Sequence, residues 1–326
     1  MAHVISLLNH KGGVGKTTSA INIGAGLVEL GHKVLLLDLD PQANLTVSLG
    51  IARQPVTIYE SLRGEAELEP VTVKDGLDVV TSSLDLSGAE MELVNEPGRE
   101  FLLRGLFEPL QDEYDYIIID CPPSLGLLTL NALTSSNYVY IPLQTEFLAL
   151  QGVAKIKQVI DKVKFRLNKQ LSIGGVIATM YDQRKVLNRD VVATIKKYFG
   201  DRVFETMIRN NVALAEAPAQ RLDIFAYSPK SNGAHDYLAL CGEIVSRCEN
   251  PAFEMGKAAT NKRLSTAATR APLAAAAPPA RPSAKAAAAA FNGTAAVAAT
   301  TAPPSSPPAR GYAGAEPAAR EVVDLR

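Results

Sequence analysis

The first 250 residues alternate short apolar runs with longer segments in which apolar residues recur every three or four positions. Short apolar runs predict buried strands, and the wider spacing predicts helices that pack on one side. Strands are expected at residues 4–8, 33–39, 77–81, 116–120, 138–143 and 173–180. Helices are expected at residues 17–30, 57–62, 85–94, 99–110, 126–136, 147–167, 188–199 and 235–248. This alternation predicts an α/β fold, a mostly parallel twisted sheet with helices on both faces.

The composition changes near residue 252 and divides the chain in two. Alanine runs at residues 274–277 and 286–290 and three proline pairs follow that point. Such a segment has too few large apolar side chains to offset the entropy that is lost when a chain becomes ordered. We therefore expect a folded domain at residues 1–252 and a disordered Ala/Pro-rich tail at residues 253–326.

The net charge of −1 conceals an uneven distribution. From Glu254 onward nine Lys and Arg stand against four Asp and Glu, a net charge of +5. The residues before it hold 24 against 30, a net charge of −6. An acidic domain thus carries a basic tail, which is either a solubilising appendage or a segment that contacts DNA, a membrane or a partner.

The three cysteines, Cys121, Cys241 and Cys248, lack the spacing of a metal site or a disulfide framework. This usage is typical of a reduced, cytoplasmic protein, and Cys121 is expected to be a small buried residue. The first nine residues do not form a signal peptide. No apolar run reaches the roughly 18 residues that a membrane-spanning helix needs, so no membrane span is expected.

The strongest chemical signal is the glycine-rich stretch between the first strand and the first helix. Its glycines let the backbone approach phosphate oxygens, Lys16 supplies a positive charge, and the Thr17 hydroxyl can ligate Mg²⁺. The general phosphate-loop pattern requires a glycine where His10 stands, and a second lysine, Lys11, follows it. The alternative, a glycine-rich turn without a ligand, does not explain two lysines in one loop. The predicted phosphate-binding residues are Lys11, Gly12, Gly13, Val14, Gly15, Lys16, Thr17 and Thr18.

Three carboxylates end predicted strands. Asp38 and Asp40 close the second strand, and Asp120 closes the apolar run at residues 116–120. In open α/β sheets the carboxyl ends of the strands are where ligands bind, and a carboxylate there can hold Mg²⁺ through water. The alternative for Asp38 and Asp40 is a purely structural role, in which they cap the turn at Pro41.

Together these motifs resemble the deviant Walker A box and accompanying segments of the ParA/MinD family, and most closely the small, Soj-like ParA partition ATPases. The matching segments are residues 11–18, 36–42, 117–123, 211–218 and 229–234. The resemblance covers residues 1 to about 250 and implies a P-loop ATPase domain that uses ATP and Mg²⁺. Residues 168–171, Asn-Lys-Gln-Leu, lack the Asp that GTP-binding relatives use to grip guanine, which also favours ATP.

The resemblance also implies roles for single residues. Lys11, Lys16 and Asp40 would be catalytic, with Asp40 positioning the attacking water and Lys11 reaching the ATP of a second subunit in a homodimer. Thr17, Asp38 and Asp120 would serve the metal. Asn211 and Pro218 would lie near the adenine.

The same family pattern implies a switch that binds DNA non-specifically as an ATP-bound homodimer and is released when a ParB-like partner stimulates slow hydrolysis. Such a cycle, in the cytoplasm and on the nucleoid, segregates or positions a plasmid, a chromosome or a protein cargo. The candidate DNA-binding residues are Arg184, Arg189, Lys196, Lys197, Arg209 and Arg221. Asn210 and Ala213 stand where relatives tend to be basic, so the helix at residues 147–167 and the tail stay open as other DNA surfaces.

Two other functions fit less well. A MinD-like membrane-associated ATPase ends in a basic amphipathic helix, whereas residues 316–326 are short and contain acids. An iron–sulfur relative needs paired cysteines at the dimer axis, and Cys241 and Cys248 are poorly spaced for this. The loop begins at residue 9, which leaves no room for an N-terminal helix-turn-helix domain, so operator-specific repression is not expected.

Overall fold

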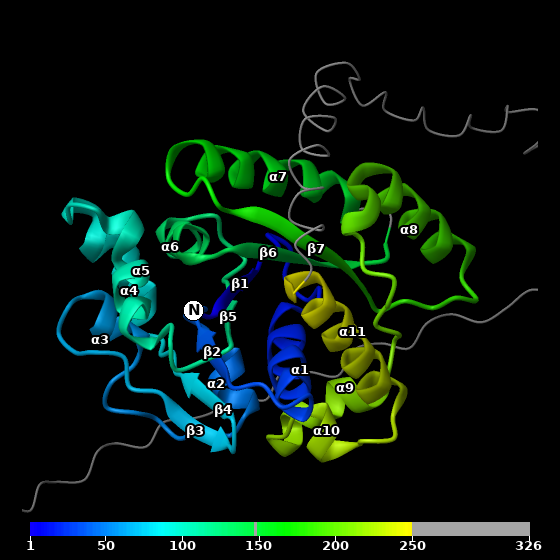
Figure 1. Ribbon diagram of the computed structural model, residues 1–326, viewed down its shortest axis with the longest axis horizontal. Helices are drawn as coiled ribbons and strands as arrows, with labels where there is room; N and C mark the ends of the chain where they lie inside the picture. The colour runs from blue at the N-terminus through cyan, green and yellow to red at the C-terminus, as the bar shows by residue number, and fades with distance from the viewer. Residues whose placement is uncertain (147–148, 250–326) are drawn as a thin grey trace, which may run out of the picture. The chain divides into compact units, whose positions relative to one another are not determined.

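A computed structural model describes residues 1–146 and 149–249, which form one seven-stranded sheet with strand order β3-β4-β2-β5-β1-β6-β7 (Figure 1). Every neighbouring pair is parallel except β3 and β4. The strands are β1 (His3–Leu7), β2 (Val34–Asp38), β3 (Val71–Lys74), β4 (Leu77–Val80), β5 (Tyr116–Asp120), β6 (Tyr138–Gln144) and β7 (Ser172–Thr179). The predicted fold class is confirmed.

Helices cover both faces of the sheet (Figure 1). One face is covered by α1 (Lys16–Glu29), α9 (Val212–Glu216), α10 (Ile224–Tyr227) and α11 (Asn232–Glu249), and α2 (Asn44–Ser48) also packs there. The other carries α3 (Ile58–Leu62), α4 (Leu86–Glu92), α5 (Leu102–Phe107), α6 (Leu127–Ser135), α7 (Ala149–Arg166) and α8 (Val186–Phe199). Short 3₁₀ turns are η1 (Leu93–Asn95), η2 (Arg99–Phe101), η3 (Glu108–Leu110), η4 (Gly200–Arg202) and η5 (Ala217–Gln220).

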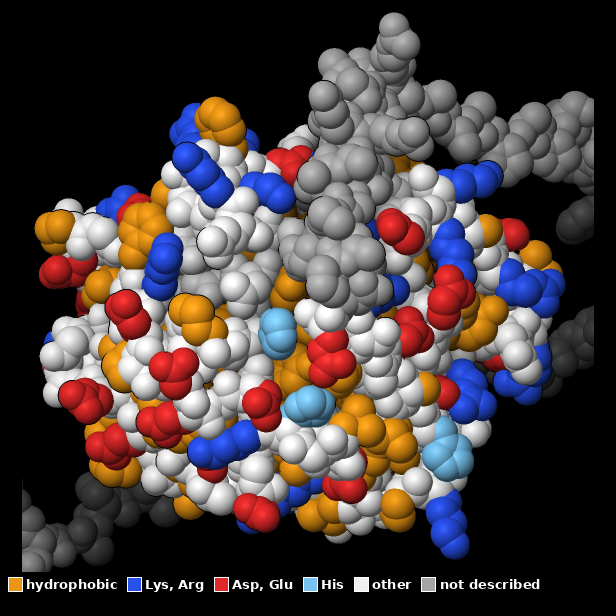
Figure 2. Space-filling model, viewed as in Figure 1, with side chains coloured by type: hydrophobic (Ala, Val, Ile, Leu, Met, Phe, Trp, Pro, Cys, Tyr) orange, Lys and Arg blue, Asp and Glu red, His pale blue; other side chains and the backbone are white. Residues whose placement is uncertain are grey.

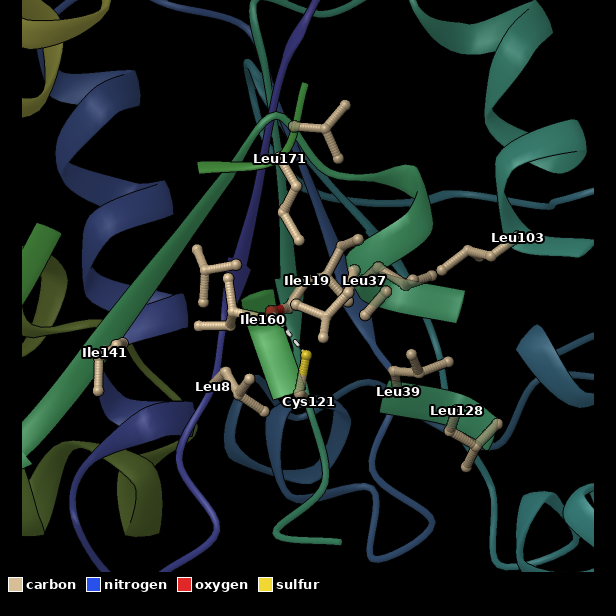
Figure 3. Packing of buried hydrophobic residues seen from close by; sticks show 14 of the residues in the cluster. Leu8, Leu37, Leu39, Leu103, Ile119, Cys121, Leu128, Ile141, Ile160 and Leu171 are labelled. Carbon is tan, nitrogen blue, oxygen red and sulfur yellow. Dashed lines mark hydrogen bonds between the residues drawn. The ribbon is translucent and has the colours of Figure 1, made fainter. Parts of the chain in front are cut away.

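Alternate residues of each strand enter different cores, as the two-residue period of a strand requires. In β5, Ile117 and Ile119 pack under α6 and α7, whereas Tyr116 and Ile118 pack under α1 and α11. Figure 3 shows the first core around Cys121, which lies among Leu8, Leu39 and Ile160 and whose thiol faces the Ile119 carbonyl. Burial raises the pKa of the Cys121 thiol, so this cysteine is an inert core residue.

Several sequence expectations differ from the structure. Strand β3 and helices α2, α9 and α10 were not predicted, because all four are short and β3 has no fully buried residue. The helix expected at residues 99–110 is divided into η2, α5 and η3. Phe101 leaves helical geometry with φ −120° and ψ 4°, and Pro109 stands in the first turn of η3.

Two expectations concern residues outside the described ranges. The helix expected at residues 147–167 is described only from residue 149, and the tail expected at residues 253–326 lies wholly outside. Within the described part of the chain, no helix combines the length and apolar character needed to cross a membrane.

Candidate nucleotide-binding site

The glycine-rich loop joins β1 to α1 at the carboxyl edge of the sheet. Gly13 and Gly15 have φ of 73° and 89°, in the left-handed region where a side chain is disfavoured. Neighbouring strands hold the loop in place: the Asn9 amide donates to the Pro142 carbonyl at 2.7 Å, and the Thr179 hydroxyl donates to the Val14 carbonyl at 2.9 Å. Gly15 caps α1 without a side chain, so the first N–H groups of that helix face the loop.

A cavity of about 440 Å³ lies over this loop. The predicted phosphate-binding residues that line it are Gly12, Gly13, Gly15, Lys16, Thr17 and Thr18, together with Asp40 and Pro218. Sequence reasoning missed other lining residues, among them Asn22, Gln42, Asn44, Met180 and Leu222. Asn211 does not line the cavity: its side chain caps α9 by accepting from the Ala213 N–H at 2.8 Å. The contact of Asn211 with adenine therefore stays a prediction.

Asp38 and Asp120 are direct neighbours in the pairing of β2 with β5, and both are fully buried. Burial raises the pKa of Asp38 to about 6, although hydrogen bonds from the Thr46 N–H and hydroxyl favour its charged form. Burial, with the Asp38 charge adding to it, raises the pKa of Asp120 to about 8, while the Thr17 hydroxyl and the Lys16 ammonium oppose the rise. Two coupled carboxylates thus share a dry site beneath the loop.

The Asp120 carboxylate is suited to a hydrated cation. Neither of its oxygens accepts a hydrogen bond of normal geometry from another described residue, and an unpartnered buried carboxylate is costly. Mg²⁺ is usually held by one or two carboxylates, phosphates and water rather than by a full protein cage. The described ranges contain no cluster of three or more His, Cys, Asp or Glu arranged to hold a metal. Thr17, Asp38 and Asp120 therefore fit a Mg²⁺ that arrives with a nucleotide.

Asp40 stands at the wall of the cavity and is 8% exposed. The backbone fixes its carboxylate, because Oδ1 accepts the Gln42 N–H at 3.0 Å. Its own carbonyl accepts the Ser82 hydroxyl at 2.9 Å. A carboxylate held in this way can orient a water molecule toward a phosphate.

Lys11 is placed differently from Lys16. The Lys16 side chain is buried in the cavity, whereas Lys11 does not line the cavity at all. Its ammonium donates to Gln144 Oε1 at 3.3 Å, at the last residue of β6, and to Glu146 Oε2 at 3.2 Å, two residues further on. The loop therefore carries one lysine for its own cavity and one that faces outward.

A larger cavity of about 540 Å³ lies between α3, α4 and α5, lined by residues such as Leu62, Arg63 and Glu92. It contains none of the loop residues or strand-end carboxylates. We assign the nucleotide to the smaller cavity because that one has the phosphate-binding chemistry.

Comparison with known proteins agrees with this geometry. The family model described as an AAA domain matches residues 2–173. The chain is 48% identical over 250 residues to the chromosome-partitioning ATPase Soj of Treponema pallidum, covering 76% of this chain and 98% of that protein. It is 43% identical to the chromosome partitioning protein ParA of Caulobacter vibrioides over 251 residues, covering 75% of this chain and 94% of that protein.

The chain belongs to the ParA/Soj family of partition ATPases. Among solved structures, cobyrinic acid a,c-diamide synthase from Mycobacterium smegmatis with bound ADP and magnesium matches with a TM-score of 0.69 and 36% identity, covering 77% of this chain and 97% of that one. The cell division ATPase MinD of Pyrococcus furiosus matches with a TM-score of 0.63 and 28% identity, covering 76% and 99%. The predicted family and the predicted ATPase activity are confirmed.

The candidate DNA-binding residues of this partition ATPase are dispersed, and several are already engaged within the protein. Arg184 forms a two-pronged pair with Asp182 and lowers the pKa of that carboxyl to about 2. Arg209 clamps Asp236 at 2.6 Å, and Lys196 pairs with Glu205 at 2.7 Å. The remaining candidates, Arg189, Lys197 and Arg221, lie exposed, and Arg189 donates to the Gln183 carbonyl.

Helix α7 of the ParA/Soj domain begins against the phosphate loop, and Gly152 makes that contact possible. A Cβ at Gly152 would collide with the His10 imidazole. We expect Gly152→Ala to displace His10 and the loop, and so to lower kcat/KM for ATP about 10-fold or more, in line with the cost of misplaced catalytic groups. The check is steady-state ATPase kinetics together with the Tm.

Gly242→Ala in α11 is the matched control, because a Cβ there meets nothing within 4 Å. Removing a helical glycine stabilises by roughly 0.5–1 kcal/mol. The control should therefore keep full activity with an equal or higher Tm. Equal activity of the two variants would contradict a tight contact between α7 and the loop.

Proposed function

We propose that this partition ATPase is an ATP-dependent dimerising switch that binds DNA non-specifically and partitions the chromosome. The position of Lys11 carries the proposal. It belongs to the phosphate loop yet stays outside the cavity of its own subunit, at the exposed end of β6. A second copy that faces this edge would receive the ammonium on its ATP, so that each subunit completes the other's site.

The residues that line the cavity and those around it divide the work of hydrolysis. The backbone N–H groups of the loop and the Lys16 ammonium hold the phosphates, and Lys11 adds charge from the other subunit. Thr17, Asp38 and Asp120 would hold Mg²⁺, which would supply positive charge to the phosphates. Asp40 orients the attacking water. Loss of the γ-phosphate removes much of the charge that attracts Lys11, and this loosens the dimer.

The dimer and its partners complete the cycle. The ATP-bound homodimer binds DNA through phosphate contacts, and a ParB-like partner accelerates the slow hydrolysis that releases it. We place this cycle in the cytoplasm, on the nucleoid. Residues 1–252 form the ATPase domain, and residues 253–326 are a separate Ala/Pro-rich tail.

Asp40→Ala tests the switch, because it removes the water-orienting carboxylate and leaves the phosphate loop intact. With Mg²⁺ and ATP we expect hydrolysis to fall about 100-fold or more and a stable dimer to accumulate, since general-base groups contribute roughly 10²–10⁴ in rate. Light scattering should find the dimer, and non-specific duplex DNA should shift in a salt-sensitive way.

Asp112→Ala is the control, because Asp112 is an exposed carboxylate whose ion pair among the described residues is with the N-terminal amine. It should behave as the unmodified protein. If Asp40→Ala with ATP gives neither a dimer nor DNA binding, the proposed function is wrong.

A further inference from the structure

Charge is strongly separated along the folded chain. Residues 1–146 hold eight Lys and Arg against twenty Asp and Glu, a net charge of −12. Residues 149–199 hold eleven against three, a net charge of +8. Figure 2 shows acidic side chains gathered over the side that carries α3 to α5, and basic side chains over α7 and α8. One side of the domain therefore attracts polyanions while the other repels them.

Within the basic side, α7 carries a row of cations that are not paired with another described residue. We define the α7 stripe as Lys155, Lys162, Arg166 and, in the turn after the helix, Lys169. All four are exposed, and none forms an ion pair or hydrogen bond with another described residue. Lys157, by contrast, pairs with Asp161 at 2.5 Å. The stripe thus differs from Arg184, Arg209 and Lys196, each of which forms an ion pair with a carboxylate of the same chain.

The helix geometry aligns these cations. Positions 155, 162 and 166 are seven and four residues apart, so they share one side of α7. At 1.5 Å per residue they span roughly 16 Å, and B-DNA carries one phosphate charge per roughly 1.7 Å of its axis. A duplex laid along α7 would meet every cation of the stripe.

The opposite side of α7 is used for folding. Val153, Ile156, Ile160 and Val163 are buried against the sheet, and residues 152–166 of α7 present no second apolar face to insert into a lipid surface. Phe165 is exposed beside the stripe, but one ring does not make an apolar face. The stripe therefore fits the phosphate backbone of DNA better than a membrane.

We infer that the α7 stripe is the surface that binds the DNA backbone, an inference that rests on the proposed non-specific DNA binding. Because α7 begins against the phosphate loop at His10, dimerisation at that loop places two stripes in one particle. Two linked sites bind a polymer far more tightly than one. ATP therefore controls DNA affinity by pairing stripes that are individually weak.

The test compares two variants with the same loss of charge. Lys162→Ala/Arg166→Ala removes two cations from the stripe, and Arg53→Ala/Arg104→Ala removes two exposed cations from the acidic side. Binding of a random-sequence duplex is measured by fluorescence anisotropy with Mg²⁺ and ATP at several salt concentrations. Basal ATPase and light scattering show that each variant is folded and dimerises.

We expect the stripe variant to lose about tenfold or more in affinity near 0.1 M salt, and its slope of log K against log salt to shrink by about 1.8 per protomer, since each phosphate contact contributes about 0.9. The control should match the unmodified protein within about twofold. An unchanged slope in the stripe variant, with unmodified protein still binding DNA, overturns the α7 assignment and leaves the proposed function standing. If unmodified protein binds no DNA but binds phosphatidylglycerol vesicles through the stripe, both are overturned.

Discussion

Asp120→Asn is expected to raise the thermal stability of the nucleotide-free protein at pH 8.5 and, in the same molecule, to abolish Mg²⁺-dependent ATP hydrolysis. The substitution replaces a buried charge, which accepts no hydrogen bond of normal geometry from another described residue, by a neutral amide of the same shape. The thermal stability rises because folding no longer has to desolvate that charge. Activity is lost because the carboxylate that fits Mg²⁺ is gone.

The direction in which stability changes with pH follows from the shift of the Asp120 pKa. The pKa of Asp120 in the folded protein is about 8, above the roughly 3.9 of an unfolded Asp. A raised pKa contributes stability that is complete below the unfolded pKa and is lost as the pH rises through the folded pKa. Asp38, with its pKa raised to about 6, acts in the same direction. The unmodified protein should therefore lose stability from about pH 4 to pH 8, and Asp120→Asn should lose less.

The measurement is the Tm at pH 6 and pH 8.5 by calorimetry, with and without Mg²⁺ and ATP. Each kcal/mol should move the Tm by about 2–4 °C in a domain of this size. Asp112→Asn is the matched control, since this exposed carboxyl should change neither Tm nor activity. A lower Tm for Asp120→Asn at pH 8.5 would show that the buried charge is compensated in the nucleotide-free protein.

The local sequence was sufficient for the strands and the phosphate loop. Buried parallel strands such as β5 are continuous apolar runs that can be recognised in the sequence. Gly13 and Gly15 likewise indicate a loop whose backbone needs positive φ. Edge strand β3 is half exposed, and its pattern is too weak to distinguish from a loop.

Contacts between distant segments were beyond sequence reasoning. Thr46 donates to Asp38, eight positions earlier in the chain, and Glu146 pairs with Lys11 across 135 positions. Neither contact can be read from a single sequence, because each depends on the order in which β1, β2 and β6 lie in the sheet. The free or engaged state of Arg184 and Lys162 is likewise a property of packing.

Lys11→Ala should abolish the ATP-induced dimer while a single subunit still binds ATP. Lys11 does not line the cavity of its own subunit, so truncation leaves the phosphate contacts of Lys16 and the loop in place. What disappears is the charge supplied to the other subunit's ATP. We expect nucleotide affinity within about threefold of normal by fluorescent-ATP titration, dimerisation weakened by about 100-fold or more, and DNA binding lost with it, as expected for a desolvated charge contact worth 2–5 kcal/mol.

Glu146→Gln removes the ion pair that Lys11 forms within its own subunit and keeps the Lys11 ammonium. The pair is half exposed on both sides, so it contributes no more than about 1 kcal/mol. Its removal leaves Lys11 in place and should shift dimerisation less than about fivefold, toward easier assembly, because Lys11 no longer has to leave Glu146. If Glu146→Gln lost the dimer as fully as Lys11→Ala, the pair itself would be what assembly requires. A large effect of Lys11→Ala with a small, opposite effect of Glu146→Gln assigns the requirement to a lysine that must leave its own subunit.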